Sequence, residues 1–302
     1  MSTSRKNTAI RISIISNTSL ASLKLVVGIF MQSVSVISEA LHSGIDLLAA
    51  VIAYFAVREA AKPPDDKHRF GHGRIENISG TIEAILIFVA GMYIIAAAIN
   101  KLLSEHIEIE GLGLGAAVMA FSAAVNWFVS SHLLKVARET DSIAIQADGM
   151  HLRTDVYTSA GVFVGLMLMK FSKVTILDPL IAIGVAFLII KMAYNLTKSA
   201  FMNILDIKLP NEEEAIIRRI LDGYSHNYIE YHKLRTRKAG ADRHIDMHLV
   251  VSKNMSVELS HQLAHDIGTQ IEALLPHSHV LVHVEPCEDM CDKCNKSSCD
   301  TL

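Results

Sequence analysis

The stretch Glu39-Ala40-Leu41-His42-Ser43-Gly44-Ile45-Asp46, with its echo Asp148-Gly149-Met150-His151-Leu152-Arg153-Thr154-Asp155, decides how this chain is organised. Both octads read acid-x-x-His-x-x-x-Asp, and both lie in apolar sequence. A helix presents residues i and i+4 on one face, so each octad points an imidazole and a carboxylate in the same direction. Two such helices facing each other would offer two nitrogen and two oxygen donors, which suits tetrahedral Zn²⁺. The candidate metal ligands are therefore His42, Asp46, His151 and Asp155.

The alternative interpretation makes His42 and His151 core residues that hydrogen-bond to neighbouring helices. A single histidine of this kind would favour that interpretation. Two copies with identical spacing favour a metal site, because every ionisable side chain placed in lipid is costly. The acids that open the octads are Glu39 and Asp148. They either hydrogen-bond to the metal ligands without binding the ion themselves or lie at the cytoplasmic mouth of the site.

Composition predicts a membrane part and a soluble part. The 302 residues are 51% apolar and 20% charged, and their mean hydropathy is +0.33. Such a chain is too apolar for a wholly soluble protein and too charged for a wholly buried one. A net charge of −3 argues against a nucleic-acid partner, which would require a basic excess.

Six apolar segments of roughly 20 residues are each long enough to cross a bilayer. Basic residues gather before the first segment, between the second and third, and between the fourth and fifth, which places both termini in the cytoplasm. We therefore expect a cytoplasmic tail over residues 1–9 and a six-helix transmembrane domain over residues 10–204. The expected helices are 10–32, 33–57, 75–102, 112–134, 143–171 and 177–204.

Residues 205–286 have the pattern of a soluble α+β domain. The periodicity predicts a helix to about residue 224, strands over 228–237 and 243–251, a helix over 256–274 and a strand over 279–285. The order αββαβ suits a small open sheet covered by helices. Phosphate-binding loops, nucleophile elbows and His-Glu-x-x-His motifs are absent from the sequence, so we expect no enzyme.

Two further sets of polar residues could bind metal on the cytoplasmic side. Asp65, His68 and His72 lie within eight residues of one another and could converge on an ion, although a solvated charged loop would have the same spacing. In the soluble domain, alternate strand residues share a face. The histidines and acids on these faces and on the intervening helix favour a bound metal cluster. They are His244, Asp246, His248, His261, His265, His283 and Glu285.

The chain ends in a cysteine-rich tail, residues 287–302. Its cysteines are the only ones in the sequence, so no disulfide framework spans the fold. A cytoplasmic location leaves thiolates available for a soft metal, which favours a metal-capturing tail over an inert one. The candidate ligands are Cys287, Cys291, Cys294 and Cys299.

Taken together, these features resemble the cation diffusion facilitator family of zinc transporters, over about residues 10–287. The resemblance lies in the six segments, the paired octads, the loop Asp65-Asp66-Lys67-His68-Arg69-Phe70-Gly71-His72-Gly73-Arg74, the run Leu177-Asp178-Pro179 and the histidine-rich domain. Within this family, the chain is similar to the bacterial ferrous-iron/zinc efflux type. The resemblance implies a homodimer in the bacterial inner membrane that exports cytosolic Zn²⁺ in exchange for protons. The cytoplasmic domain, of ferredoxin or metallochaperone type, would sense metal and support the dimer.

The resemblance also implies roles for individual residues. The octad histidines and aspartates would form the transport site, and Asp65, His68 and His72 a loop site. A charge pair between Arg74 and Asp206 would tie the dimer together. His42 stands where many bacterial relatives have Asp, which implies a preference for zinc, with Cd²⁺ or other divalent cations as further candidates. The binuclear cytoplasmic site would comprise His232, His248, His261, His283 and Glu285, with Glu285 as the bridge.

Two other functions remain open at this point. In the first, the chain is a membrane-anchored metal sensor whose octads are structural. In the second, it is an intramembrane metalloenzyme, although a catalytic zinc usually keeps one open position and a general base nearby. Both alternatives predict that the reconstituted protein transports no zinc.

Overall fold

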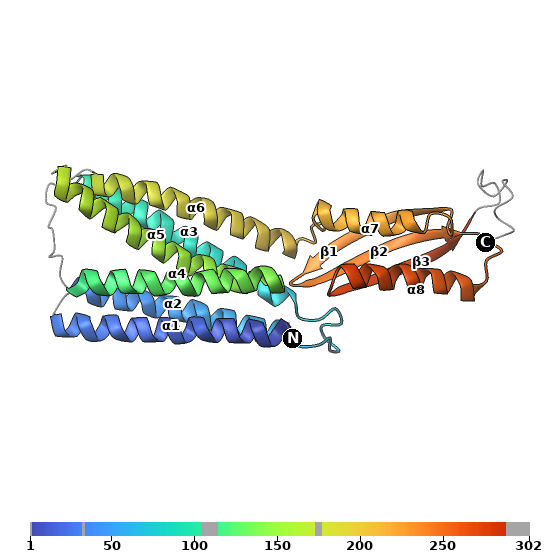
Figure 1. The fold of residues 1–302 in the computed structure, drawn as a ribbon, viewed down its shortest axis with the longest axis horizontal. Coiled ribbons are helices and arrows are strands. Elements are labelled where there is room, and N and C mark those ends of the chain that lie inside the picture. The colour runs from blue at the N-terminus through green and yellow to red at the C-terminus, as the bar shows by residue number, and fades with distance from the viewer. Residues whose placement is uncertain (1, 32–33, 104–113, 173–176, 288–302) are drawn as a thin grey trace. The chain divides into compact units, whose positions relative to one another are not determined.

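The computed structural model describes residues 2–31, 34–103, 114–172 and 177–287 (Figure 1). The chain divides into two compact units, Met1–Met202 and Asn203–Leu302, and each is considered by itself. Apolar helices fill the first unit, and the second combines helices with a sheet, as the hydropathy pattern predicts.

Six helices make up the described part of the first unit. By length and composition, four of them, α1, α3, α4 and α6, are apolar enough to cross a membrane. The other two, α2 and α5, carry the octads and therefore most of the ionisable side chains of interest. The helices are α1 (Ser2–Met31), α2 (Val34–Ala60), α3 (Arg74–Leu103), α4 (Leu114–Thr140), α5 (Ile143–Ser172) and α6 (Leu177–Ile204).

Helix α1 begins earlier than hydropathy alone suggests. Residues 2–9, which we expect to form a tail, continue the first helix. The reason is tertiary: the Lys6 ammonium lies 2.7 Å from Glu76 Oε1 on α3, and both side chains are buried. Ile10 is also fully buried against residues of α4 and α5. These contacts stabilise a polar opening turn that sequence periodicity does not predict.

Helix packing brings α2 and α5 into contact. In Figure 1, α1 lies along α2, and α5 meets α4 toward one end and diverges from it toward the other. One apolar cluster forms where these four helices meet, and a second forms between α3, α5 and α6. The backbones of α3 and α5 approach closely at the start of α5. Gly80 of α3 allows this approach, since a Cβ at that position would collide with the Ile143 side chain. The two octads therefore occupy adjacent helices.

The second unit has the predicted order αββαβ. Its sheet order is β1-β2-β3, with β1 and β2 antiparallel and β2 and β3 parallel. Alternate residues of β2, namely Ile245, Met247 and Leu249, are fully buried in a core shared with α7 and α8. The intervening residues face the other side of the sheet. The elements are α7 (Asn211–Gly223), β1 (Glu230–Ala239), β2 (Asp242–Val251), α8 (Val257–Leu274) and β3 (Ser278–Pro286).

Candidate metal sites

Helices α2 and α5 bring the four octad ligands together. His151 Nε2 lies 2.8 Å from Asp46 Oδ1. His42 Nε2 lies 3.9 Å from the same oxygen and 4.0 Å from Asp155 Oδ1. Ligand atoms of His42, Asp46 and Asp155 all lie within 4.8 Å of one another, and His151 joins this group through Asp46. Two nitrogens and two carboxylates thus converge from two helices.

Burial gives this octad group one closed side and one accessible side. The Asp46 and His151 side chains are 6% and 10% exposed, whereas the His42 side chain is 50% exposed. Donors about 2.0–2.2 Å from a tetrahedral zinc ion lie roughly 3.3 Å apart. The contacts of 2.8, 3.9 and 4.0 Å lie on either side of that spacing, so the donors must rearrange for all four to bind one ion.

The loop between α2 and α3 forms a second candidate group. The two oxygens of Asp65 lie 3.3 Å from His68 Nδ1 and 3.4 Å from His72 Nε2. Gly71, at φ +82°, permits the turn that brings His72 back toward Asp65. The His68 backbone N–H donates to Asp65 Oδ1 at 2.6 Å, and this bond is the main reason that the pKa of Asp65 is lowered. The carboxylate is therefore ionised at neutral pH and can attract a cation.

The exposed face of the sheet carries the third group. Strand pairing aligns His232, His248 and His283 on β1, β2 and β3. Glu285 Oε1 lies 2.7 Å from His248 Nδ1 and 3.6 Å from His283 Nε2, and its Oε2 lies 3.1 Å from His232 Nε2. Hydrogen bonding to His248 is the main cause of the lowered pKa of Glu285. Ligand atoms of His232, His248 and Glu285 lie within 4.8 Å of one another.

A β-bulge shapes this sheet group. The register between β1 and β2 shifts after His232, and the next residue, Lys233, has a φ of +52°. Such an irregularity re-aims side chains relative to a regular strand. The alternation of the sequence predicts the strand, but only the bulged backbone turns the His232 ring toward Glu285.

Other predicted ligands lie apart from these groups or outside the described residues. His261 is exposed on α8, where its ring stacks on His265 with centroids 6.4 Å apart, and it is not part of the three-residue sheet group. Cys287 is buried, and its N–H donates to Val251 O at 2.9 Å. The remaining tail cysteines, Cys291, Cys294 and Cys299, lie outside the described residues. Roles for these residues remain predictions.

Arg74 and Asp206 belong to different units, so the expected charge pair between them stays a prediction. Arg74 is the first residue of α3 in the first unit. Within the second unit, Asp206 Oδ1 accepts a hydrogen bond from Arg237 Nη1 at 3.2 Å. Asp206 therefore has one basic partner in its own unit before any contact with Arg74.

Sequence reasoning did not single out two polar contacts near the octads. The Arg153 guanidinium of α5 lies 4.0 Å from the centre of the Trp127 ring on α4 and donates to Ser131 Oγ at 2.9 Å. Buried Lys24 of α1 donates to Ser43 Oγ, beside His42, at 2.8 Å. The signal that could have found both is a charged residue inside an apolar segment.

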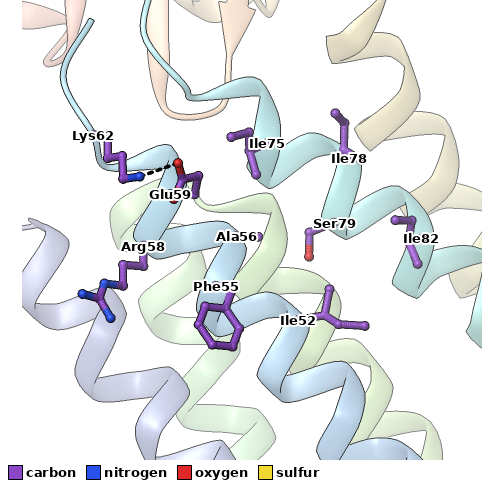
Figure 2. Close-up of a pocket in the computed structure, with 10 residues that line it drawn as sticks. All are labelled: Ile52, Phe55, Ala56, Arg58, Glu59, Lys62, Ile75, Ile78, Ser79 and Ile82. Atoms are coloured by element: carbon purple, nitrogen blue, oxygen red, sulfur yellow. Dashed lines mark hydrogen bonds and ion pairs between the residues drawn. The ribbon is translucent and has the colours of Figure 1, made fainter. Parts of the chain in front are cut away.

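A hollow of about 590 Å³ between α2 and α3 is distinct from the metal-binding groups. Figure 2 shows its apolar lining, which includes Ile52, Phe55 and Ile82, with the Glu59–Lys62 ion pair at one end. It contains none of the candidate metal ligands. Most of its wall is apolar and its one carboxylate, Glu59, already pairs with Lys62, so this hollow does not suit metal binding.

Comparison with known proteins covers nearly the whole chain. The model of the cation efflux transmembrane domain matches residues 10–205, and the model of the cytoplasmic domain of cation efflux proteins matches residues 209–287. An uncharacterized transporter of Synechocystis sp. is 35% identical over 272 residues, which is 89% of this chain and 87% of that protein. The cation-efflux pump FieF of Yersinia pestis is 29% identical over 278 residues, which is 90% of this chain and 91% of that protein. A solved structure of CzrB, a candidate zinc transporter, in its zinc form is 33% identical, covers 27% of this chain and 92% of that chain, and has a TM-score of 0.26.

Proposed function

We propose that this chain, which belongs to the cation efflux family, exports Zn²⁺ from the cytoplasm in exchange for protons. Membership makes it an integral membrane cation transporter with a cytoplasmic domain, and not an enzyme. The observation that carries the choice of zinc is the convergence of two imidazoles and two carboxylates from α2 and α5. This mixed donor set suits a borderline-soft divalent ion better than a hard one.

Ligand chemistry couples the ion to protons. An imidazole binds metal only when its ligating nitrogen is deprotonated. In the structure, His151 Nε2 and Asp46 Oδ1 are 2.8 Å apart, so a proton held between them and a metal ion would compete for the same two atoms. Binding of Zn²⁺ would therefore release protons, and arriving protons would release Zn²⁺.

Alternating access then requires that α2 and α5 move, either against each other or as a pair against the other helices. The accessible side of the octad group lies at His42, whose side chain is half exposed. Loading would occur while the octad group communicates with the cytoplasm, and release would follow when the helices open it to the opposite side. Both termini would remain in the cytoplasm, and the membrane would be the bacterial inner membrane.

The other two groups would serve the same transport cycle. The loop group of Asp65, His68 and His72 would capture cations near the cytoplasmic surface. The sheet group of His232, His248 and Glu285 would bind Zn²⁺ as a sensor and support a homodimer. Cd²⁺ and other divalent cations with an affinity for imidazole would be weaker substrates.

Reconstitution in liposomes tests the transport site. We expect the D46A/D155A variant to lose Zn²⁺-dependent proton flux, because it removes both oxygen donors from the octad group. The matched control is E59A/E139A, which removes two exposed acids of the same unit that pair with Lys62 and Arg5. This control should retain the flux.

Size-exclusion chromatography in detergent shows whether each variant keeps its assembly. Retained flux in a monodisperse D46A/D155A protein would refute the assigned site. An unmodified protein that binds Zn²⁺ but never moves it across the liposome membrane would instead support the membrane-anchored sensor.

A further inference from the structure

A pair of buried carboxylates lies between α3 and α5, outside the octad group. Asp148 of α5 and Glu83 of α3 are each 1% exposed, and they lie close enough to interact electrostatically. We call these two residues the acid pair. Both also interact electrostatically with His151. Two like charges in a low-dielectric interior repel each other, so a positive species is needed beside them.

Contacts along α3 and α5 locate the acid pair on the loop side of His151. At the beginning of these helices, Ser142 Oγ donates to the Glu76 carboxylate. Slightly deeper, Gly80 packs against Ile143. The acid pair follows within about the next turn of each helix, and His151 comes three residues after its α5 member. An ion that moves inward from the loop end of α3 would therefore reach the acid pair before His151.

Hydrogen bonding distinguishes the acid pair from another buried carboxylate nearby. Glu76 is 3% exposed and is satisfied by Lys6 at 2.7 Å and by Ser142. Among the described residues, no hydrogen bond of ordinary geometry reaches Asp148, which has only a weaker contact with the Ser13 hydroxyl, and the one partner of Glu83 is Ser79, at a long 3.5 Å. Buried polar atoms without partners usually mark a bound ion or water.

A third oxygen donor points toward the acid pair. Ser13 of α1 is fully buried, and its hydroxyl faces the Asp148 carboxylate. In the described part of the chain, this hydroxyl has no hydrogen-bond partner other than this contact with Asp148. Donors from α1, α3 and α5 thus meet at one place.

We propose that the acid pair and Ser13 form a binding site for a divalent cation. Two ionised carboxylates match the charge of one divalent ion, which would displace the protons that otherwise neutralise these buried groups. The donors are all oxygens, so the site favours a hard or partly hydrated ion and does not select zinc. This inference deepens the proposed function: the ion would pause here before the more selective imidazoles of the octad group receive it.

Counting bound Mn²⁺ tests the site directly, because Mn²⁺ prefers oxygen ligands and its free form is quantified by electron paramagnetic resonance. The full chain in detergent micelles is titrated with Mn²⁺. We expect the E83Q/D148N variant to bind one ion fewer per protomer than the unmodified protein. The matched control is E76Q, which neutralises an equally buried but fully bonded acid on the same helix and should leave the count unchanged.

A second variant separates loss of the carboxylates from damage to the packing. E83D/D148E keeps both carboxylates and should retain the ion. An unchanged count in E83Q/D148N, or the same loss in a monodisperse E83D/D148E protein, would overturn the proposal. An unchanged count combined with an altered pH profile of Zn²⁺ uptake would show that the acid pair holds a proton instead.

The experiment also distinguishes this inference from the proposed function. Mn²⁺ counting requires no transport, so a protein that loses the ion as expected but moves no Zn²⁺ contradicts only the proposed function. In a transporting protein, E83Q/D148N should raise the KM for Zn²⁺ severalfold with kcat changed less than about twofold. The reason is that a site which the ion occupies before it reaches the octad group affects the loading of Zn²⁺, and so KM, but not its release.

Discussion

Glu285 is the residue on which the sheet group depends. Its two oxygens contact His232, His248 and His283, which come from three different strands. Removing it would leave imidazoles that face one another without a negative charge between them. The lowered pKa of Glu285 also means that the folded domain favours its ionised form.

The direction of this pKa shift sets the pH range in which Glu285 acts. Because the folded pKa lies below the ordinary value of 4.5, its contribution to stability is present above that value. It is lost as the pH falls through the lower folded pKa. Between about pH 5.5 and 7.5 the carboxylate stays ionised, so any pH dependence of metal binding there comes from protonation of imidazoles.

We therefore expect E285Q to weaken Zn²⁺ binding by about 10- to 100-fold without changing the shape of its pH dependence. The measurement is competition with a chelating dye at several pH values, in full chain that carries D46A/D155A. E230Q serves as the control, because Glu230 lies 3.8 Å from His232 at the edge of the group. Equal affinities of E285Q and E230Q would contradict the bridging role.

At the scale of elements, α4 and α5 pack as a close pair. A Cβ on Gly149 would lie 3.0 Å from Leu134 Cγ, so the helices approach closely within the second octad. Four residues further on, Arg153 lies over the Trp127 ring and donates to Ser131. Because Arg153 lies between His151 and Asp155 in the sequence, this contact holds the turn of α5 that carries these candidate ligands against α4.

Substitution of Trp127 tests this helix contact. A partly desolvated cation–π contact contributes about 1–2 kcal/mol, so W127L should lower the apparent unfolding temperature in detergent and reduce the rate of Zn²⁺ uptake. W127F keeps an aromatic face and should retain most of both properties. If W127L and W127F behave alike, the ring contributes through its volume and not through the charge of Arg153.

At the scale of the whole molecule, the proposed function predicts that the membrane unit and the cytoplasmic unit act together. The first unit holds two apolar clusters and two candidate metal-binding groups, and the second holds one apolar core and one candidate group. If the sheet group senses zinc as proposed, contacts between the two units would carry its effect to the transport site. The expected pair of Arg74 and Asp206 is such a contact, and Arg237 already bonds to Asp206.

A charge exchange tests this connection between the units. We expect R74E to weaken the homodimer, because it places an acid against Asp206, and the double variant R74E/D206R to restore it. Mass photometry of the detergent-solubilised protein measures the dimer fraction. R237E is the control that disturbs Asp206 from within its own unit. A dimer fraction unaffected by R74E would contradict the pairing.

The sequence by itself determined the helices, the strands and the types of ligand. Hydropathy located six helices, alternation located three strands, and the spacing His-x-x-x-Asp put His42 with Asp46 and His151 with Asp155 on common faces. All of these are local properties that depend on residues within one or two turns. The opening turn of α1 departs from the expected tail because its stability comes from Glu76, which is remote in sequence.

Only the tertiary structure decided which donors meet. It paired His151 with Asp46 of the other octad, turned His232 toward Glu285 through a bulge, kept His261 on α8 outside the three-residue group, and buried Glu83 beside Asp148. The physical reason is that such contacts depend on how whole helices and strands pack. A pattern of a few residues sets the face that a side chain occupies, but not the element that packs against that face.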